Sequence, residues 1–277
     1  MTKYIDVGSI IKQKNEQLYK ILPRFVLSYF KRIIHEDKLN ADLTMLEGLN
    51  TRDKFRVFLE NRNFKVHVYG QENVPDDGRF MFTSNHPLGG LDGIAFYDTV
   101  ADMFPSVKFL VNDILMNIPD VDDCFLPINK HGKNSRDYFK KVDEACESDA
   151  QILSFPAGIV SRKINGQVQD LPWMKSCVSY PKKYKRNVVP VFIDGVNSNF
   201  FYNLANVRKR LGIRANLEMF FLVDELYKFA NRSLKIVFGK PIPYMYFDSS
   251  KKDIEWAAFL REQTYKLGES FKENKIT

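Results

Sequence analysis

The chain has 277 residues, and its 41 Lys and Arg against 34 Asp and Glu give a formal net charge of +7. A hydrophobic fraction of 44% with 23 Phe and 13 Tyr excludes an intrinsically disordered chain, and 14 Gly and 12 Pro are too few for a collagen-like one. This length fits one large α/β domain with a small helical segment. The positive charge favours polyanionic partners: nucleic acid, an anionic membrane surface or phosphorylated ligands.

The cysteines and the apolar runs exclude further classes of protein. The 3 Cys lie far apart and form no CxxC pair, so we expect a reducing compartment and neither a disulfide framework nor a thiolate zinc site. Charged residues interrupt positions 1–17 too early for a secretory signal, and no run reaches the roughly 18 apolar residues of a membrane-spanning helix. No zinc-finger spacing or RNP-type octamer occurs, so nucleic acid is not an expected partner. The basic residues at 182–186 are predicted to form a solvated loop, and contact with a carrier protein or lipid head groups is the alternative.

Residues 1–60 are predicted to form an N-terminal helical segment. Between positions 18 and 34, apolar side chains recur with helical spacing. The opposite side of this stretch is basic, with Lys20, Arg24 and Lys31. Pro23 should kink or split it. Such an amphipathic stretch fits two structures equally well: an ordinary surface helix that covers the core, or an interfacial helix that lies on anionic lipid.

Residues 61–277 are predicted to form an α/β domain. From residue 65 onward, strand-type alternation and helical periodicity follow each other along the chain. Strands are expected at 65–69, 79–83, 107–111, 151–155, 188–193 and 234–238, and helices at 92–103, 135–147, 199–211 and near the C-terminus. Strands separated by helical crossovers predict a mostly parallel sheet flanked by helices, with the site in loops at the strand ends.

The most informative stretch is residues 83–93, TSNHPLGGLDG. A strand ends here, His86 follows on a turn that two glycines tighten, and Asp92 stands at the start of the next helix. A carboxylate beside one ring nitrogen would fix the imidazole tautomer and leave the other nitrogen to accept a proton from a hydroxyl group. On spacing alone, this dyad and a loop histidine near an ordinary helix-capping aspartate explain the pattern equally well.

A second stretch, residues 154–163, has the sequence SFPAGIVSRK. It leaves a strand, turns at Pro156 and Gly158, and presents Ser161 and Arg162 in the following loop. Backbone N–H groups and a guanidinium in such a turn can bind an anion. Taken alone, the stretch is better explained as an ordinary strand exit with a solvated arginine.

Together the two stretches resemble motifs of the glycerolipid (lysophospholipid) acyltransferase superfamily. NHPLGGLD is similar to its first motif, FPAG with Ser-Arg to its FPEG motif, and VVPV at 188–191 to its last apolar block, and the likeness covers residues 65–243. This sequence differs from the phospholipid branch in three ways. Five residues separate His86 from Asp92, where the branch has four, and Ala157 replaces the glutamate of FPEG. The region that matches the middle motif offers only Lys130, where the branch has an arginine. The pattern is closer to the hemolysin-like branch, the ornithine- and glycine-type aminolipid acyltransferases.

The resemblance implies an acyltransferase that is peripheral on the inner, cytoplasmic face of the membrane and needs no cofactor and no metal. It would move a fatty acyl group from acyl-CoA or acyl-carrier protein to the free hydroxyl of a lyso-lipid. His86 would be the general base, and Asp92 would orient and stabilise its imidazolium. The preferred acceptor is a hydroxyacyl amino-acid lipid. The alternative is lysophosphatidate, the acceptor of a 1-acylglycerol-3-phosphate acyltransferase.

Candidate substrate-binding residues follow from the same resemblance. Arg162 would bind the anionic group of the acceptor or the phosphates of the donor, because its guanidinium fork suits both. Lys130 and Lys175 are further candidate cations, but Lys175 is better explained as a solvated lysine. Ser161 belongs to the same loop as Arg162. Backbone N–H groups near Gly158 or in the Gly89/Gly90 turn would meet the oxyanion. The rival explanation is a non-catalytic basic module that binds membrane or nucleic acid with salt-sensitive affinity and consumes no thioester.

Overall fold

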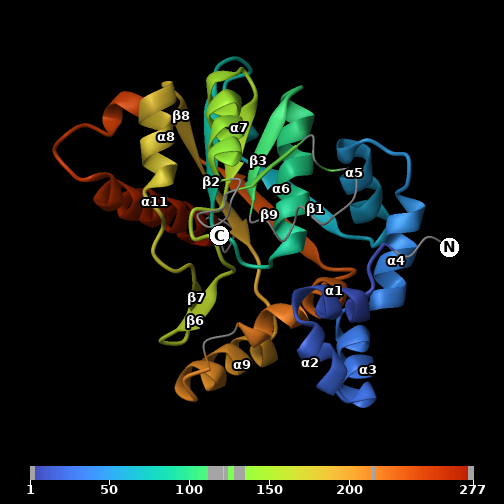
Figure 1. Ribbon diagram of the computed structural model, residues 1–277. Helices are drawn as coiled ribbons and strands as arrows, with labels where there is room; N and C mark the ends of the chain where they lie inside the picture. The colour runs from blue at the N-terminus through green and yellow to red at the C-terminus, as the bar shows by residue number, and fades with distance from the viewer. Residues whose placement is uncertain (1–3, 112–120, 122–123, 128–134, 214–215, 274–277) are drawn as a thin grey trace.

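The computed structural model describes residues 4–111, 121, 124–127, 135–213 and 216–273. Its centre is a seven-stranded sheet with the order β1-β9-β8-β2-β5-β3-β4 (Figure 1). In the described part of this sheet, every neighbouring pair of strands is parallel except β8 and β9. The strands are β1 (Lys65–Tyr69), β2 (Phe80–Ser84), β3 (Val107–Val111), β4 (Phe125–Pro127), β5 (Gln151–Ser154), β8 (Asn187–Asp194) and β9 (Ser233–Phe238). The predicted mostly parallel α/β fold is confirmed.

The sheet is covered on both faces, as the uninterrupted burial of β2 requires. Phe80 and Phe82 lie in the larger core together with residues of α5 and α6. Met81, between them, packs on the opposite face against α7 and α8. Its neighbour Val188 in β8 packs on that same face against α8 and α11. These helices are α5 (Thr51–Asn61), α6 (Gly90–Met103), α7 (Ser135–Glu147), α8 (Ser176–Tyr184) and α11 (Asp253–Glu273).

Most predicted elements are present, with ends that shift by no more than two residues. The strand β4 and the antiparallel hairpin of β6 (Arg162–Ile164) and β7 (Gln167–Gln169) were not predicted, because three residues are too few to display an alternating pattern. The sequence also did not predict that β9 runs antiparallel to β8. The chain between β8 and β9 carries α9 (Asn199–Arg210), the short helix η3 (Leu217–Phe221) and α10 (Leu222–Lys228).

The N-terminal segment breaks where Pro23 predicted it. The helix α2 ends at Ile21, and Pro23 is the N-cap residue of α3, with φ −60° and ψ 143°. The ring of Phe30 in α3 lies 5.4 Å from that of Phe220 in η3, so the segment packs against the chain that follows β8. Within the described ranges, no helix combines the length and apolarity needed to cross a bilayer. The first helices are α1 (Val7–Lys14), α2 (Glu16–Ile21), α3 (Arg24–Ile33) and α4 (Glu36–Met45).

Arg186 corrects the prediction of a solvated basic loop at 182–186. Its side chain is fully buried, and burial lowers its pKa to about 10. The guanidinium satisfies its donors with backbone carbonyl groups at the end of α7 and the starts of two strands: those of Ala145, Cys146, Ser148, Ala150 and Phe80. Such a buried cation is compatible with folding because its donors are paired. The hydrogen bonds of Arg186 therefore link the end of α7 to the sheet.

Candidate active site

His86 stands on the turn between β2 and α6, at the carboxyl edge of the parallel sheet. Strand β2 pairs with β5, so the two motif stretches leave neighbouring strands at the same edge. Gly89 has a φ of 90°, and a Cβ at this position would lie 3.2 Å from Leu222. A glycine is therefore required for the turn that carries His86.

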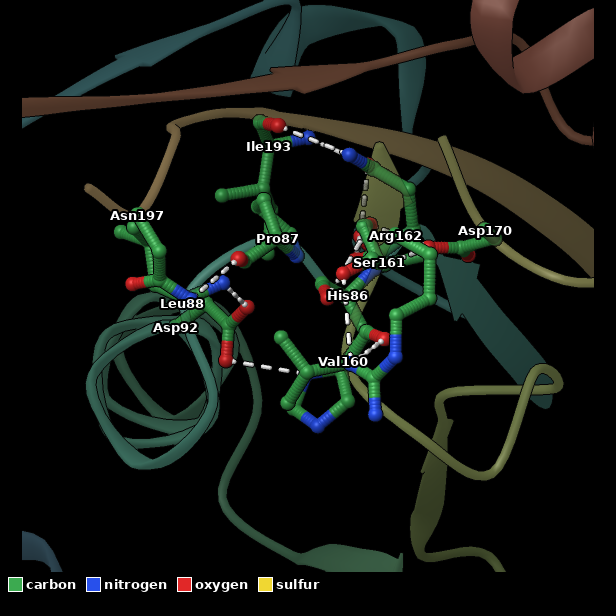
Figure 2. Close-up of polar contacts among 12 residues, drawn as sticks. His86, Pro87, Leu88, Asp92, Val160, Ser161, Arg162, Asp170, Ile193 and Asn197 are labelled. Carbon is green, nitrogen blue, oxygen red and sulfur yellow. Dashed lines mark hydrogen bonds and ion pairs between the residues drawn. The ribbon is translucent and has the colours of Figure 1, made fainter. Parts of the chain in front are cut away.

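Asp92 lies fully buried in the first turn of α6 and faces the imidazole of His86. Its Oδ1 is 3.0 Å from Nδ1 of His86, and its Oδ2 accepts a 2.8 Å hydrogen bond from the N–H of Leu88 (Figure 2). The Nδ1–Oδ1 contact has ion-pair length without the alignment of a regular hydrogen bond. Neither atom has a hydrogen-bond partner among the described residues. Asp92 therefore supports the turn with one oxygen and faces the imidazole with the other.

Phe155, the first residue after β5, holds the plane of the His86 ring. The two rings stack with centroids 4.0 Å apart and an interplanar angle of 17°. The His86 side chain keeps 17% of its surface exposed although Nδ1 is buried, and Figure 2 shows the other ring nitrogen directed away from Asp92. An imidazole held in this way can take a proton at Nε2 from a group that approaches from outside.

A second buried carboxylate, Asp170, holds the backbone of the same turn. Its Oδ1 accepts hydrogen bonds from the His86 N–H at 3.2 Å and the Ser161 hydroxyl at 2.5 Å. Its Oδ2 accepts from the indole N–H of Trp173 at 2.9 Å. Burial raises the pKa of Asp170, and these three donors oppose the shift. The N–H of Ser161 also donates to the His86 carbonyl at 2.7 Å, so both backbone groups of His86 are held.

Two asparagines tie the turn to the end of β8. Asn85 donates to the carbonyl of Ile193 at 2.8 Å and accepts from the N–H of Ile193 at 2.7 Å. The amide of Asn197 donates to the carbonyl of Pro87 at 3.1 Å. Asn85 lies inside the first motif, where a polar residue at the end of a buried strand was visible. Nothing local in the sequence pointed to Asn197.

The acyltransferase family model matches residues 9–274, nearly the whole chain. The chain belongs to the acyltransferase family. This acyltransferase is similar to a lyso-glycine lipid O-acyltransferase of Bacteroides thetaiotaomicron, with 43% identity over 264 residues that cover 95% of this chain and 97% of that protein. It is 42% identical to a lyso-glycine lipid O-acyltransferase of Phocaeicola vulgatus, over 95% of each chain. The resemblance drawn from the motifs is confirmed.

Among solved structures, this acyltransferase is similar to the 1-acyl-sn-glycerophosphate acyltransferase PlsC from Thermotoga maritima. The TM-score is 0.48 and the sequence identity 16%, over 95% of this chain and 92% of that one.

Of the predicted substrate-binding residues of the acyltransferase, Ser161 contacts the His86 turn directly and Gly158 contacts Phe155. Ser161 is buried, and its hydroxyl is directed at Asp170, so it supports the turn. Gly158 has a φ of 66°, and its N–H donates to the carbonyl of Phe155 at 2.9 Å. In this arrangement that N–H is not offered to an oxyanion.

The predicted cations lie in different settings. Arg162 forms a 2.9 Å ion pair with the buried Glu218 and keeps only 11% of its side-chain surface exposed, so it is not the solvated arginine of an ordinary strand exit. Lys175 is exposed at the N-cap of α8. Lys130 lies outside the described residues. The structure therefore brings Arg162, but not Lys175, into a polar cluster next to the turn.

Of the two dyad side chains, that of His86 keeps 17% of its surface exposed and that of Asp92 keeps none. Two depressions of the described chain lie between the end of β8 and the residues at 225–233, and His86 lines neither of them. Within the described ranges, no three His, Cys, Asp or Glu side chains converge in a way that could hold a metal ion. The exposed edge of the His86 ring is the part of the dyad that a substrate can reach.

We expect the Asp170→Asn variant to lower the free energy of unfolding by about 1–3 kcal/mol, because an amide cannot accept hydrogen bonds at both of its ends. One of the donors now bound by the carboxylate would lose its acceptor. Urea unfolding of wild type and variant measures the difference. Asp76→Asn, in an exposed turn, is the control and should leave stability unchanged. Equal stability of the Asp170 variant and wild type would contradict this role.

Proposed function

We propose that this acyltransferase moves a fatty acyl group from a thioester, acyl-CoA or acyl-carrier protein, to the free hydroxyl of a lyso-lipid, with His86 as general base. The observation that carries the proposal is the setting of the His86 ring. It stacks on Phe155, faces the buried Asp92 at 3.0 Å through Nδ1, and directs its other nitrogen away from that carboxylate (Figure 2). An imidazole in this environment can accept a proton from an alcohol.

The proposed reaction is a direct transfer. The acceptor hydroxyl gives its proton to Nε2 of His86 while its oxygen attacks the thioester carbonyl carbon. The C–S bond breaks, the acyl group remains on the acceptor oxygen as an ester, and the imidazolium returns the proton to the leaving thiolate. Asp92 stabilises the imidazolium, because a carboxylate beside Nδ1 favours the charged ring. No covalent acyl-enzyme forms in these steps.

The acceptor in this proposal is a hydroxyacyl amino-acid lipid of the glycine type. Two curated relatives that share 43% and 42% identity over 95% of this chain are lyso-glycine lipid O-acyltransferases, which supports this acceptor. Ala157, in place of the acidic residue of the phospholipid motif, points the same way. The alternative acceptor is lysophosphatidate, which would make the protein a 1-acylglycerol-3-phosphate acyltransferase.

A competition assay tests the acceptor. The purified enzyme receives equal concentrations of lyso-glycine lipid and lysophosphatidate with one acyl thioester, and mass spectrometry quantifies the two products. We expect the diacylated glycine lipid to dominate. Turnover of lysophosphatidate alone would replace the proposed acceptor with the alternative. Salt-sensitive binding to vesicles without consumption of thioester would favour the non-catalytic module.

We further propose that α2, α3, η3 and α9 form a lipid-facing end of the molecule. Figure 1 shows α2, α3 and α9 at the same end of the molecule. The helix α9 follows β8 in the chain, so this end lies beyond the carboxyl end of β8. Large apolar side chains are exposed there, with Ile21 77%, Phe25 75% and Leu211 69% exposed. Exposed basic residues are their neighbours in the sequence: Lys20, Arg24, Lys209 and Arg210. Exposed apolar groups flanked by cations suit an anionic bilayer surface.

Replacing Phe25 with Asp is expected to weaken binding to phosphatidylglycerol vesicles about ten-fold, because an apolar group that enters the interface is lost and a repelled charge is added. Co-sedimentation with vesicles measures the affinity. The control is Met245→Asp in the short helix η4 (Tyr244–Tyr246), which is 72% exposed outside the lipid-facing end. If both variants bind as tightly as wild type, the lipid-facing end is wrongly assigned.

A further inference from the structure

Glu218 in η3 is a fully buried carboxylate that binds two arginines. Its Oε1 accepts from Nη2 of Arg162 at 2.9 Å and from Nη2 of Arg208 at 3.2 Å, and its Oε2 accepts from Nε of Arg208 at 2.8 Å. Arg162 comes from β6 and Arg208 from α9, so the cluster joins three elements. Because a buried carboxylate needs paired donors, Glu218 and the two arginines depend on one another.

This arginine cluster lies next to the His86 turn. Ser161, the residue before Arg162, donates its N–H to the His86 carbonyl at 2.7 Å. Burial raises the pKa of Tyr202 to about 12, and the charges of both Asp92 and Arg162 act on its phenol. Asp92 of the dyad and the guanidinium of Arg162 therefore both lie close enough to Tyr202 to affect the pKa of its phenol.

The charges of the cluster sum to +1, from two guanidinium groups and one carboxylate. The side chains of Arg162 and Arg208 keep only 11% and 13% of their surfaces exposed, and that of Glu218 keeps none. Water screens charges weakly in such a setting, so a mismatch of one unit charge is costly. The net charge of the cluster consequently limits which anion can bind there.

We propose that Glu218 is a specificity-determining residue, which lowers the charge around Arg162 so that the site accepts a monoanionic carboxylate headgroup in preference to a phosphomonoester. This inference rests on the proposed function and on the expectation from the sequence that Arg162 binds the anionic group of the acceptor. A guanidinium binds a phosphate as well as a carboxylate, and this role explains why Arg162 is paired with the buried Glu218.

The charge balance favours the glycine-type headgroup. One carboxylate brings the cluster from +1 to 0, whereas a phosphomonoester of about −1.5 to −2 leaves uncompensated negative charge in a poorly solvated place. Among the described residues, Nη1 of Arg162 donates to the carbonyls of Val160 at 2.7 Å and Ser161 at 3.4 Å, and Nη2 also lies 3.8 Å from Sδ of Met219. Its Nε–H donates to no described residue, so this N–H is the donor that remains for a ligand. Glu218 occupies only part of the donor fork of Arg162.

Two variants that change the charge in opposite directions test the proposal. Glu218→Gln brings the cluster to +2 and should lower the ratio of kcat/KM for lyso-glycine lipid to kcat/KM for lysophosphatidate about ten-fold. Arg208→Gln brings it to 0 and should lower kcat/KM for the glycine lipid about ten-fold without improving lysophosphatidate. Glu262→Gln, a surface change on α11, is the control for loss of a carboxylate. Thermal unfolding establishes that each variant is folded.

A purely structural role of Glu218 predicts equal losses for both acceptors, and an unchanged ratio in both folded variants would overturn the proposal. If Glu218→Gln does not fold, the wild type still decides. An N-acylglycine should then inhibit it about ten-fold more strongly than an alkyl phosphate of the same chain length, and equal inhibition would overturn the proposal. Failure of the proposed acyl transfer is distinguishable, because wild-type enzyme would then acylate neither the glycine lipid nor lysophosphatidate.

Discussion

Replacing His86 with Ala is expected to lower the rate of acyl transfer about 100- to 10,000-fold, the contribution of a positioned general base. The alanine has no group that can take the proton of the acceptor hydroxyl, and the rest of the turn keeps its contacts. Asp92 would still accept from the Leu88 N–H, and Asp170 would still accept from the backbone N–H of residue 86. Release of free thiol from the acyl thioester, followed with lyso-glycine lipid present, measures the rate.

The matched control is His67→Ala, because this histidine is exposed on strand β1 and has no place in the proposed reaction. It should retain full activity. Thermal unfolding of the His86 variant is needed as well, since the lost ring stacks on Phe155. A folded His86→Ala enzyme that keeps more than about one tenth of wild-type activity would eliminate the general-base mechanism.

Replacing Asp92 with Asn is expected to lower the rate by a similar factor, about 100- to 10,000-fold, through the wrong tautomer of His86. The asparagine oxygen would remain on the Leu88 N–H, so its amide N–H group would face Nδ1 and donate to it. The proton of the neutral ring would then lie on Nε2, which could not accept another from the acceptor. The amide would also fail to stabilise the imidazolium.

Asp102→Asn is the control for this variant, because Asp102 lies on the same helix, is 47% exposed and pairs with Arg52 at the surface. It should transfer acyl groups at the wild-type rate. Single-turnover measurements with saturating acceptor separate the chemical step from binding. Normal single-turnover rates in the Asp92 variant would mean that the carboxylate only caps the turn, which is the alternative that spacing alone left open.

The order of strands and helices could be predicted because its signals are local. The alternation of β1, the apolar sequence of β2 and the periodicity of α6 each lie within one short window of the chain. His86 and Asp92 belong to the same window, since a tight turn and the first turn of a helix join them. Their pairing could therefore be proposed without any knowledge of the sheet.

The supports of the turn could not be predicted, because they come from distant parts of the chain. Asp170 lies 84 residues from His86, and Glu218 lies 56 residues from Arg162. Glu218 stands within a largely apolar stretch, where a single glutamate gives no sign of two arginine partners. Arg186 was misjudged for the same reason, since its acceptors are carbonyl groups of other elements.

The sequence by itself determined the α/β class and the kinship with acyltransferases, and it placed His86 and Asp92 on one strand-to-helix turn. Only the tertiary structure decided that Phe155 stacks on His86, that Asp170 and Ser161 hold its backbone, and that Arg162 shares a buried carboxylate with Arg208. The physical reason is strand order. Side chains at the carboxyl edge meet according to which strands are neighbours and in which register, and neither is written in the pattern of a single segment.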